Sequence, residues 1–268
     1  MIPMNVLNDI VWFSKKRRAI MLLLTRGPKS AECIMKELNM TAHSLSPELK
    51  ILRDENLVIQ TSDICELSPV GFIIAENMNS LFSALAVINK DRDYWSERDL
   101  SCIPPDLCAR IGELGDYRIL DSGQDYLFDL PAEFMENLKR SSSIRCFLSY
   151  YNPVYADVYF NEALSGKNVL FMFTESVFDR IRNEKKDALC DVMKKGSVSI
   201  LVCPDDDDTR PASVCITDSF AYLSLFRSKN SKVVNEYETR WIISFDRSAL
   251  VWNTELFDHY SKCAEKII

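Results

Sequence analysis

The segment between residues 14 and 67 constrains the fold more than any other part of this 268-residue chain. Its first apolar helix includes the leucine run 22–24 and ends at Gly27-Pro28, a pair that stops a helix sharply. A short helix then begins at Ser30 and ends at Asn39, and a third, longer helix follows. Two short β-like runs, 57–59 and 64–67, complete the segment. The sequence therefore predicts three helices and a hairpin in close succession.

Three helices and a hairpin form the winged-helix variant of helix-turn-helix, which holds its third helix clear of the body for entry into a DNA major groove. Leucines at spacings of four and three line one side of this helix, at Leu45, Leu49 and Leu52. The other side carries small hydroxyls, an imidazole and cations, which approach bases and phosphates without steric cost. We expect DNA contacts from Thr41, His43, Ser44, Ser46, Lys50 and Arg53. Protein-interaction modules share this pattern, so a winged-helix interaction module without DNA binding is the alternative.

Pro47 bears on where the third helix begins. If Ser44 opens the helix, Pro47 lies in the first turn, where its missing N–H costs little. If Thr41 opens it, Pro47 should distort the helix. We expect a start near Thr41 with a distorted first turn.

Charge is distributed unevenly along the chain. The whole sequence has a net charge of −7, made up of +1 in residues 1–67 and −8 in residues 68–268. Only the N-terminal part escapes the acidic excess that would repel DNA. Its one dense cationic run is 15–18, and we expect Lys15, Arg17 and Arg18 to contact phosphates or to form ion pairs. The predicted wing carries an acid, Asp63, at its tip, so we expect it to read the groove poorly.

A long amphipathic helix is predicted after the break at Ser68-Pro69. Its apolar residues recur at intervals of four and three and form a narrow seam. They are Val70, Ile74, Met78, Leu81, Leu85 and Ile88. The seam either packs against the C-terminal part of the chain or joins two copies. We favour a homodimer, because two winged helices can hold both halves of a palindromic DNA site.

From residue 116 onwards, apolar runs alternate with helical patterns. We expect a largely parallel sheet covered by helices, with an antiparallel portion added late. The expected strands are 117–120, 144–150, 168–174, 197–203, 213–216, 221–226 and 241–245. The expected helices are 131–140, 154–164, 177–194 and 249–267.

Polar residues stand where three of these strands end. Ligands of such sheets bind beyond the carboxyl ends of the strands. We expect a small polar effector to be held there by Tyr150, Asn152, Thr174 and Glu175, which supply hydroxyls, an amide and one acid. The alternative is that these are satisfied turn residues.

Several runs resemble a known family. The basic run 15–18, Gly27-Pro28-Lys29 and segment 45–58 resemble the winged-helix head of archaeal transcription regulators of the ArsR/TrmB-like kind. Runs 93–104 and 110–114 resemble the linker and sensor of the methanogenesis regulatory protein family. Shorter runs extend the resemblance almost to the C-terminus, at 174–178, 217–218, 224–226 and 243–246.

The resemblance implies a DNA-binding transcription regulator of the α+β class. It would have a winged-helix domain at 1–67, a linker and dimerisation region at 68–115, and an α/β effector-sensing domain with a mixed sheet at 116–268. This chain departs from the family pattern in the acidic run Asp205 to Asp208 and in its nine cysteines. The resemblance does not identify an effector.

Signatures of catalysis are missing from the sequence. A hydrolase of the phospholipase D type needs a His-x-Lys pair, but the two histidines, His43 and His259, are followed two residues later by Leu45 and Ser261. The seven glycines form no nucleophile elbow, Walker loop or dinucleotide-binding fingerprint. The run Asp205 to Asp208 has ligands for Mg²⁺, but consecutive carboxylates on a loop are usually solvated. We expect no enzyme activity, no cofactor and no metal.

The nine cysteines contain no Cys-x-x-Cys pair. Three lie in apolar strand runs and are expected to be small buried hydrophobes, Cys146, Cys203 and Cys215. Cys102 and Cys108 are close in sequence, and a redox switch there is the alternative use. We see neither a signal peptide nor an apolar span long enough for a membrane, so we expect a reducing cytoplasm. The expected partners are duplex DNA, a second copy and a small-molecule effector.

Overall fold

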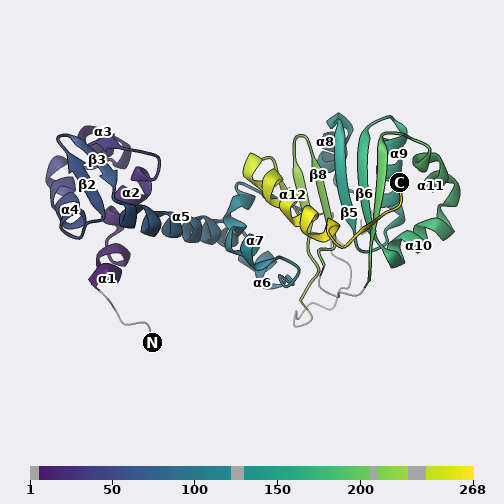
Figure 1. Cartoon of the computed structure of the whole chain (residues 1–268), viewed down its shortest axis with the longest axis horizontal. Helices are drawn as coiled ribbons and strands as arrows, with labels where there is room; N and C mark the ends of the chain where they lie inside the picture. The colour runs from purple at the N-terminus through teal and green to yellow at the C-terminus, as the bar shows by residue number, and fades with distance from the viewer. Residues whose placement is uncertain (1–5, 122–129, 206–209, 229–239) are drawn as a thin grey trace. The chain divides into compact units, whose positions relative to one another are not determined.

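The computed structural model describes residues 6–121, 130–205, 210–228 and 240–268 (Figure 1). The chain forms two compact units, unit 1 at residues 1–82 and unit 2 at residues 83–268. The division falls inside one helix, α5 (Pro69–Lys90), and not at either boundary expected from the sequence.

Unit 1 contains the predicted three helices and hairpin, with one further helix before them. The elements are α1 (Val6–Trp12), α2 (Lys15–Leu24), β1 (Lys29–Ser30), α3 (Ala31–Leu38), α4 (Ala42–Asp54), β2 (Val58–Thr61) and β3 (Ile64–Leu67), followed by the first part of α5. The three strands form an antiparallel sheet in the order β1-β3-β2. This is the winged helix-turn-helix that the sequence predicts.

Local side chains fix the ends of these helices. Ser14, Ser30 and Thr41 each accept a hydrogen bond from the backbone N–H three residues later, which satisfies a free donor in the first turn of α2, α3 and α4. Asn39 ends α3 in the left-handed conformation at φ 51°. The leucine face of α4 is buried against α2 and α3 in a common core.

The start of α4 at Ala42, with Thr41 as its cap, confirms the expected start near Thr41. The first turn is tightened, because the Thr41 carbonyl accepts the N–H groups of both Ser44 and Leu45 at 3.0 and 2.9 Å. Pro47 lies inside the helix, which nevertheless continues to Asp54. The surrounding core therefore offsets the hydrogen bond that Pro47 cannot make.

Helix α5 begins in very close contact with the hairpin. A Cβ on Gly71 would lie 1.9 Å from the Leu57 carbonyl oxygen, so only glycine fits there. The Ser68 hydroxyl donates to the Asn56 carbonyl at 2.6 Å and accepts the Gly71 N–H at 2.9 Å. Met78 is buried in the core of unit 1, which corrects the expectation that it belongs to a free seam.

Helix α5 contains a longer apolar stretch than we expected from the sequence. An 18-residue window within its 22 residues has a mean hydropathy of 1.4, and 22% of that window is buried. By length and composition it could cross a membrane, which corrects the expectation that no span is long enough. The core helix of a soluble protein passes the same test.

Unit 2 is built on an eight-stranded sheet with helices on both faces. Before and at its edge lie α6 (Arg92–Ser96), α7 (Pro105–Ala109), the 3₁₀ helix η1 (Ile111–Leu114) and β4 (Arg118–Asp121). Then follow α8 (Ala132–Arg140), β5 (Ser143–Leu148), α9 (Pro153–Leu164), β6 (Asn168–Thr174), α10 (Glu175–Glu184), α11 (Lys186–Met193) and β7 (Val198–Cys203). The last elements are β8 (Ser213–Thr217), β9 (Ala221–Ser224), β10 (Arg240–Ser244), α12 (Arg247–Ser261) and β11 (Glu265–Lys266).

The strand order is β11-β7-β6-β5-β8-β9-β10-β4. Only the β5–β6 and β6–β7 pairs are parallel, and the other five pairs between described strands are antiparallel. The mixed sheet is confirmed, but the expectation of a largely parallel sheet is wrong. Helices α9, α10 and α11 provide the crossovers that parallel neighbours need, whereas β8 and β9 are joined by a tight turn that forces antiparallel pairing.

Each face of this sheet has its own core. Helices α8 to α11 cover one face, with Phe134, Tyr159 and Phe173 among the buried side chains. Helix α12 covers the other face (Figure 1), and side chains of α7 and of the end of α5 pack into the same core. Two helix predictions need correction: 177–194 is two helices separated at Lys185, and 249–267 ends at Ser261, after which the chain forms edge strand β11.

Candidate nucleic-acid interface and effector site

Helix α4 presents the predicted DNA-contacting side chains to solvent. Five of the six expected from this helix region are exposed, namely Thr41, His43, Ser46, Lys50 and Arg53, and Ser44 is half-buried. The opposite side of the helix, with Leu45, Leu49 and Leu52, is buried. The Thr41 hydroxyl is at the same time the cap of α4. The exposed side of α4 is therefore polar, carries cations and is free of large apolar groups.

The basic run at the start of α2 divides into two sets. Lys15 and Lys16 are exposed. Arg17 is turned towards α4, where its Nε lies 3.4 Å from a carboxylate oxygen of Glu48. Ser14, the cap of α2, donates to the same oxygen at 3.4 Å. Arg17 thus takes the ion-pair alternative that the sequence left open, and it links α2 to α4.

Two further arginines are held by neighbouring elements of unit 1. The Arg18 guanidinium donates to the Trp12 carbonyl and lies 5.9 Å from the centre of the Phe82 ring. The Arg53 Nη1 donates to Gln60 Oε1 of β2 at 2.8 Å. Arg53 and Gln60 line a groove of about 280 Å³ between α3, α4 and β2, together with Ser46. Glu48 and Gln60 were missed by the sequence analysis, because only the fold brings them beside these arginines.

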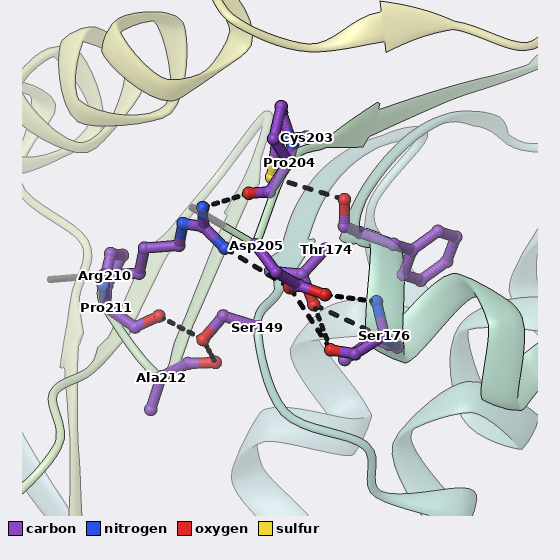
Figure 2. A network of polar contacts seen from close by, with 11 residues as sticks. Ser149, Thr174, Ser176, Cys203, Pro204, Asp205, Arg210, Pro211 and Ala212 are labelled. Carbon is purple, nitrogen blue, oxygen red and sulfur yellow. Dashed lines mark hydrogen bonds and ion pairs between the residues drawn. The ribbon is translucent and has the colours of Figure 1, made fainter. Parts of the chain in front are cut away.

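In unit 2, the carboxyl ends of β6 and β7 carry a polar network (Figure 2). The Asp205 carboxylate accepts hydrogen bonds from the backbone N–H of Ser176 at 2.8 Å and from its hydroxyl at 3.2 Å. Arg210 lies 3.5 Å from the same carboxylate and also donates to the Pro204 carbonyl. The carboxylate therefore lies at the N-terminus of α10, where a negative charge is favoured by the helix dipole. This position is filled by the chain itself.

Ser149 extends the network from the end of β5. Its hydroxyl donates to the Pro211 carbonyl at 2.7 Å and lies 3.2 Å from that of Ala212 (Figure 2). The contribution of Ser176 and Arg210 could not be read from the sequence, because only the fold brings both residues beside Asp205. Of the acidic run, only Asp205 is described, and 206–208 lie outside the described residues.

The four expected effector residues have different environments. Thr174 is 1% exposed and its hydroxyl caps α10, and Asn152 is 6% exposed and its side-chain oxygen accepts the N–H groups of Val154 and Tyr155 to cap α9. Tyr150 is half-buried, with its ring 6.1 Å from that of Tyr155. Glu175, in the first turn of α10, is exposed. The structure thus gives cap roles to Asn152 and Thr174 and leaves Glu175 accessible.

The cysteines are free thiols. Cys146, Cys203 and Cys215 are buried in the sheet, as the sequence predicts. Cys102 is also buried, and burial raises its pKa to about 12, which disfavours the reactive thiolate, while Cys108 is exposed. Within the described ranges, no cluster of three or more His, Cys, Asp or Glu side chains is arranged to hold a metal ion.

Comparison with known proteins agrees with this organisation. Residues 127–262 match the family model described as methanogenesis regulatory protein FilR1, middle domain. The chain belongs to this family. Residues 14–60 match the bacterial regulatory protein, arsR family, over most of the winged helix of unit 1. The predicted resemblance to a winged-helix regulator of the methanogenesis regulatory protein family is confirmed, and the α+β fold with it.

One relative is the methanogenesis regulatory protein FilR1 of Methanothrix harundinacea, which is 22% identical over 223 residues. The match covers 82% of this chain and 48% of the relative, so the chain spans about half the length of the curated relative it matches.

Two solved structures share more distant similarity. TrmBL2, described as an archaeal chromatin protein, is 14% identical, with a TM-score of 0.44 and coverage of 95% of this chain and 94% of its own. Nuc from Salmonella typhimurium, a phospholipase D family member, is 11% identical, with a TM-score of 0.39 and coverage of 56% of this chain and 97% of its own. Neither value is high enough to bear on function.

Proposed function

We propose that the protein is a transcription regulator that binds duplex DNA through α4. The exposed polar side of this helix carries the proposal, because it combines His43, Ser46 and Lys50 on a helix whose other side is anchored in the core. Small hydroxyls, an imidazole and a cation are suited to base edges and phosphates. The membership of a regulatory family supports this function.

Other side chains of unit 1 extend the proposed DNA surface. Thr41, Ser44 and Arg53 belong to the same helix region. We assign phosphate contacts to Lys15 and to the neighbouring Lys16, which are exposed at the start of α2. Arg17 and Arg18 make contacts within the chain, so their contribution to DNA binding is to position α2 and to add positive potential.

We further propose that the regulator acts as a homodimer through α5. Leu81 and Leu85 are 43% and 41% exposed on this helix, and Ile73 is 63% exposed. A groove of about 310 Å³ in unit 1, lined by Trp12, Ile73 and Leu81 among others, is mostly apolar. Burial of such side chains against a second copy removes apolar area from water and supplies the driving force for association.

Unit 2 is proposed to sense a small-molecule effector near the carboxyl ends of β5 and β6. Tyr150 and Glu175 are the accessible members of the four expected residues, while Asn152 and Thr174 shape the site as helix caps. An effector changes DNA affinity only if it binds one state of the regulator better than another. The protein would act in the cytoplasm, and we assign it no enzyme activity, cofactor or metal.

The proposal is tested by selecting fragments of the source genome on the purified protein and sequencing the DNA that is retained. We expect a small set of enriched fragments that share a two-fold-symmetric sequence, and a footprint over that sequence. If no fragment is enriched over input DNA, the winged helix is an interaction module and the proposal is wrong.

A further inference from the structure

Three polar residues form a row across the sheet of unit 2, on the face that helices α8 to α11 cover. Ser224 of β9 is opposite Ser213 of β8, and the β9–β10 register, which pairs Leu223 with Ile242, places Trp241 of β10 level with Ser224 when it is continued by one residue. Ser213 is in turn opposite Leu148 of β5. Residues directly opposite each other point to the same face of a sheet. We call Trp241, Ser224 and Ser213 the indole–serine row.

The polar atoms of this row are buried and have no partner in the described part of the chain. Trp241, Ser224 and Ser213 are 1%, 0% and 1% exposed. The indole Nε1 and both hydroxyl oxygens lack a hydrogen bond. Buried polar groups in native proteins are nearly always paired, because leaving one unpaired costs its full desolvation penalty. Three such groups in one register row need a common explanation.

The other two buried indoles show that this chain does pair such groups. Trp95 Nε1 donates to the Tyr117 hydroxyl, and Trp252 Nε1 donates to the Leu107 carbonyl, each at 2.9 Å. Trp241 is the exception among the three buried tryptophans.

A line of tyrosines leads from the row towards the surface. Tyr222 lies two residues before Ser224 on the same strand face, with its ring 6.1 Å from that of Trp241. The hydroxyl of Tyr155 lies beside those of Tyr222 and Tyr150. Tyr150 is half-exposed at the end of β5. The tyrosines therefore connect the buried row with the strand ends where the effector is proposed to enter.

We propose that the indole–serine row binds a small, uncharged molecule that carries a carbonyl or other hydrogen-bond acceptor and a hydroxyl or amide group. This inference rests on the proposed effector role of unit 2. The indole N–H is a donor only, so its partner must be an acceptor, whereas the serine hydroxyls both donate and accept.

The surroundings of the indole–serine row disfavour a charged ligand. The adjacent register row on the same face consists of Ile243, Tyr222, Cys215 and Cys146, none of which carries charge at neutral pH. A charged ligand would lose its hydration without gaining a counter-charge. The ligand is therefore uncharged.

The test uses the indole N–H signals of the full-length protein in a ¹H–¹⁵N spectrum, without DNA. The chain has four tryptophans, and Trp241→Phe identifies the signal of Trp241. The probe is lactamide, which combines a carbonyl, an amide and a hydroxyl. We expect a saturable downfield shift of the Trp241 signal, while the signals of Trp95 and Trp252 stay in place because their N–H groups are already paired.

Matched controls make the result specific. Lactate has nearly the same shape but is charged, and it should not shift the Trp241 signal. Ser213→Ala combined with Ser224→Ala removes two unpaired hydroxyls, so the fold should survive while the saturable shift is lost. Unmoved Trp95 and Trp252 signals in that variant verify the fold.

Three outcomes would overturn the inference: no saturable shift with lactamide, an equal shift with lactate, or an unchanged shift in the double variant. In the first case, ordered water is what satisfies the row. Since the titration contains no DNA, its failure would leave the proposed DNA binding standing.

Discussion

The Tyr117 hydroxyl donates a hydrogen bond to the backbone carbonyl of Val87, with 2.9 Å between the two oxygens. Tyr117 is fully buried just before β4, and Val87 lies in the last turns of α5. The same hydroxyl accepts the Trp95 indole N–H from α6. The Tyr117 side chain thus links the end of α5 and α6, through two hydrogen bonds, to the start of edge strand β4.

Tyr117→Phe should destabilise unit 2 by about 1–3 kcal/mol, because it leaves the buried Trp95 N–H and Val87 carbonyl unpaired. Urea denaturation followed by tryptophan fluorescence measures the loss. A cycle with Trp95→Phe should give a coupling energy of about 0.5–3 kcal/mol. Additive effects of the two substitutions would mean that the hydroxyl and the indole do not act together.

A second close contact in unit 2 involves glycine. A Cβ on Gly112 would lie 2.5 Å from the Ser83 Cβ and 2.7 Å from the Ser83 carbonyl carbon. We expect Gly112→Ala to cost about 1–3 kcal/mol, since backbone must move to admit the methyl group. Gly196 is the matched control, because a Cβ there meets nothing within 4 Å. Thermal unfolding that is equally affected by Gly112→Ala and Gly196→Ala would contradict the close approach.

Much of unit 1 could be predicted from sequence because its signals are local. Thr41 caps α4, Gly27 precedes Pro28, and the leucines of α4 follow helical spacing, each within a few residues of the feature it determines. Interactions between distant segments carry no such signal. The contact of Arg17 with Glu48 and the burial of Met78 depend on how the helices pack.

The strands of unit 2 were predictable from the sequence, but their directions were predictable only in part. Apolar runs locate the strands, and the antiparallel portion late in the chain was expected. The antiparallel pairing of β4 and β11 at the two edges of the sheet is not encoded in such runs. The break between α10 and α11 at Lys185 could not be predicted, because no glycine or proline lies there. The indole–serine row is visible only once the register of three strands is known.

Substitutions of Asn152 test its structural role as the cap of α9. Because its side-chain oxygen accepts two N–H groups at the start of α9, Asn152→Ala should lower the free energy of unfolding by about 0.5–2 kcal/mol. Asn152→Asp keeps the cap and should retain most of the stability. An Asn152→Ala protein that is as stable as the unmodified one in denaturant titrations would show that the cap is dispensable.

Leu81 tests the proposed dimer. Leu81→Asp should convert a dimer to a monomer, since an unpaired charge buried in the interface costs several kcal/mol. Sedimentation of both proteins at micromolar concentration provides the measurement. Val251→Asp is the control, because Val251 is similarly exposed, at 47%, but lies on α12. A monomeric unmodified protein would assign the apolar side of α5 to another partner.

The central claim is that α4 binds DNA, and the salt dependence of affinity for a selected duplex tests it most directly. The logarithm of the association constant should fall linearly with the logarithm of salt concentration, with a slope of about −3.6 or steeper for four or more phosphate contacts. Ser46→Ala with Lys50→Ala should abolish specific binding without loss of stability, whereas Lys186→Ala on α11, an exposed lysine in unit 2, should change nothing. Affinity that is independent of salt, or that survives in the α4 double variant, would contradict the account.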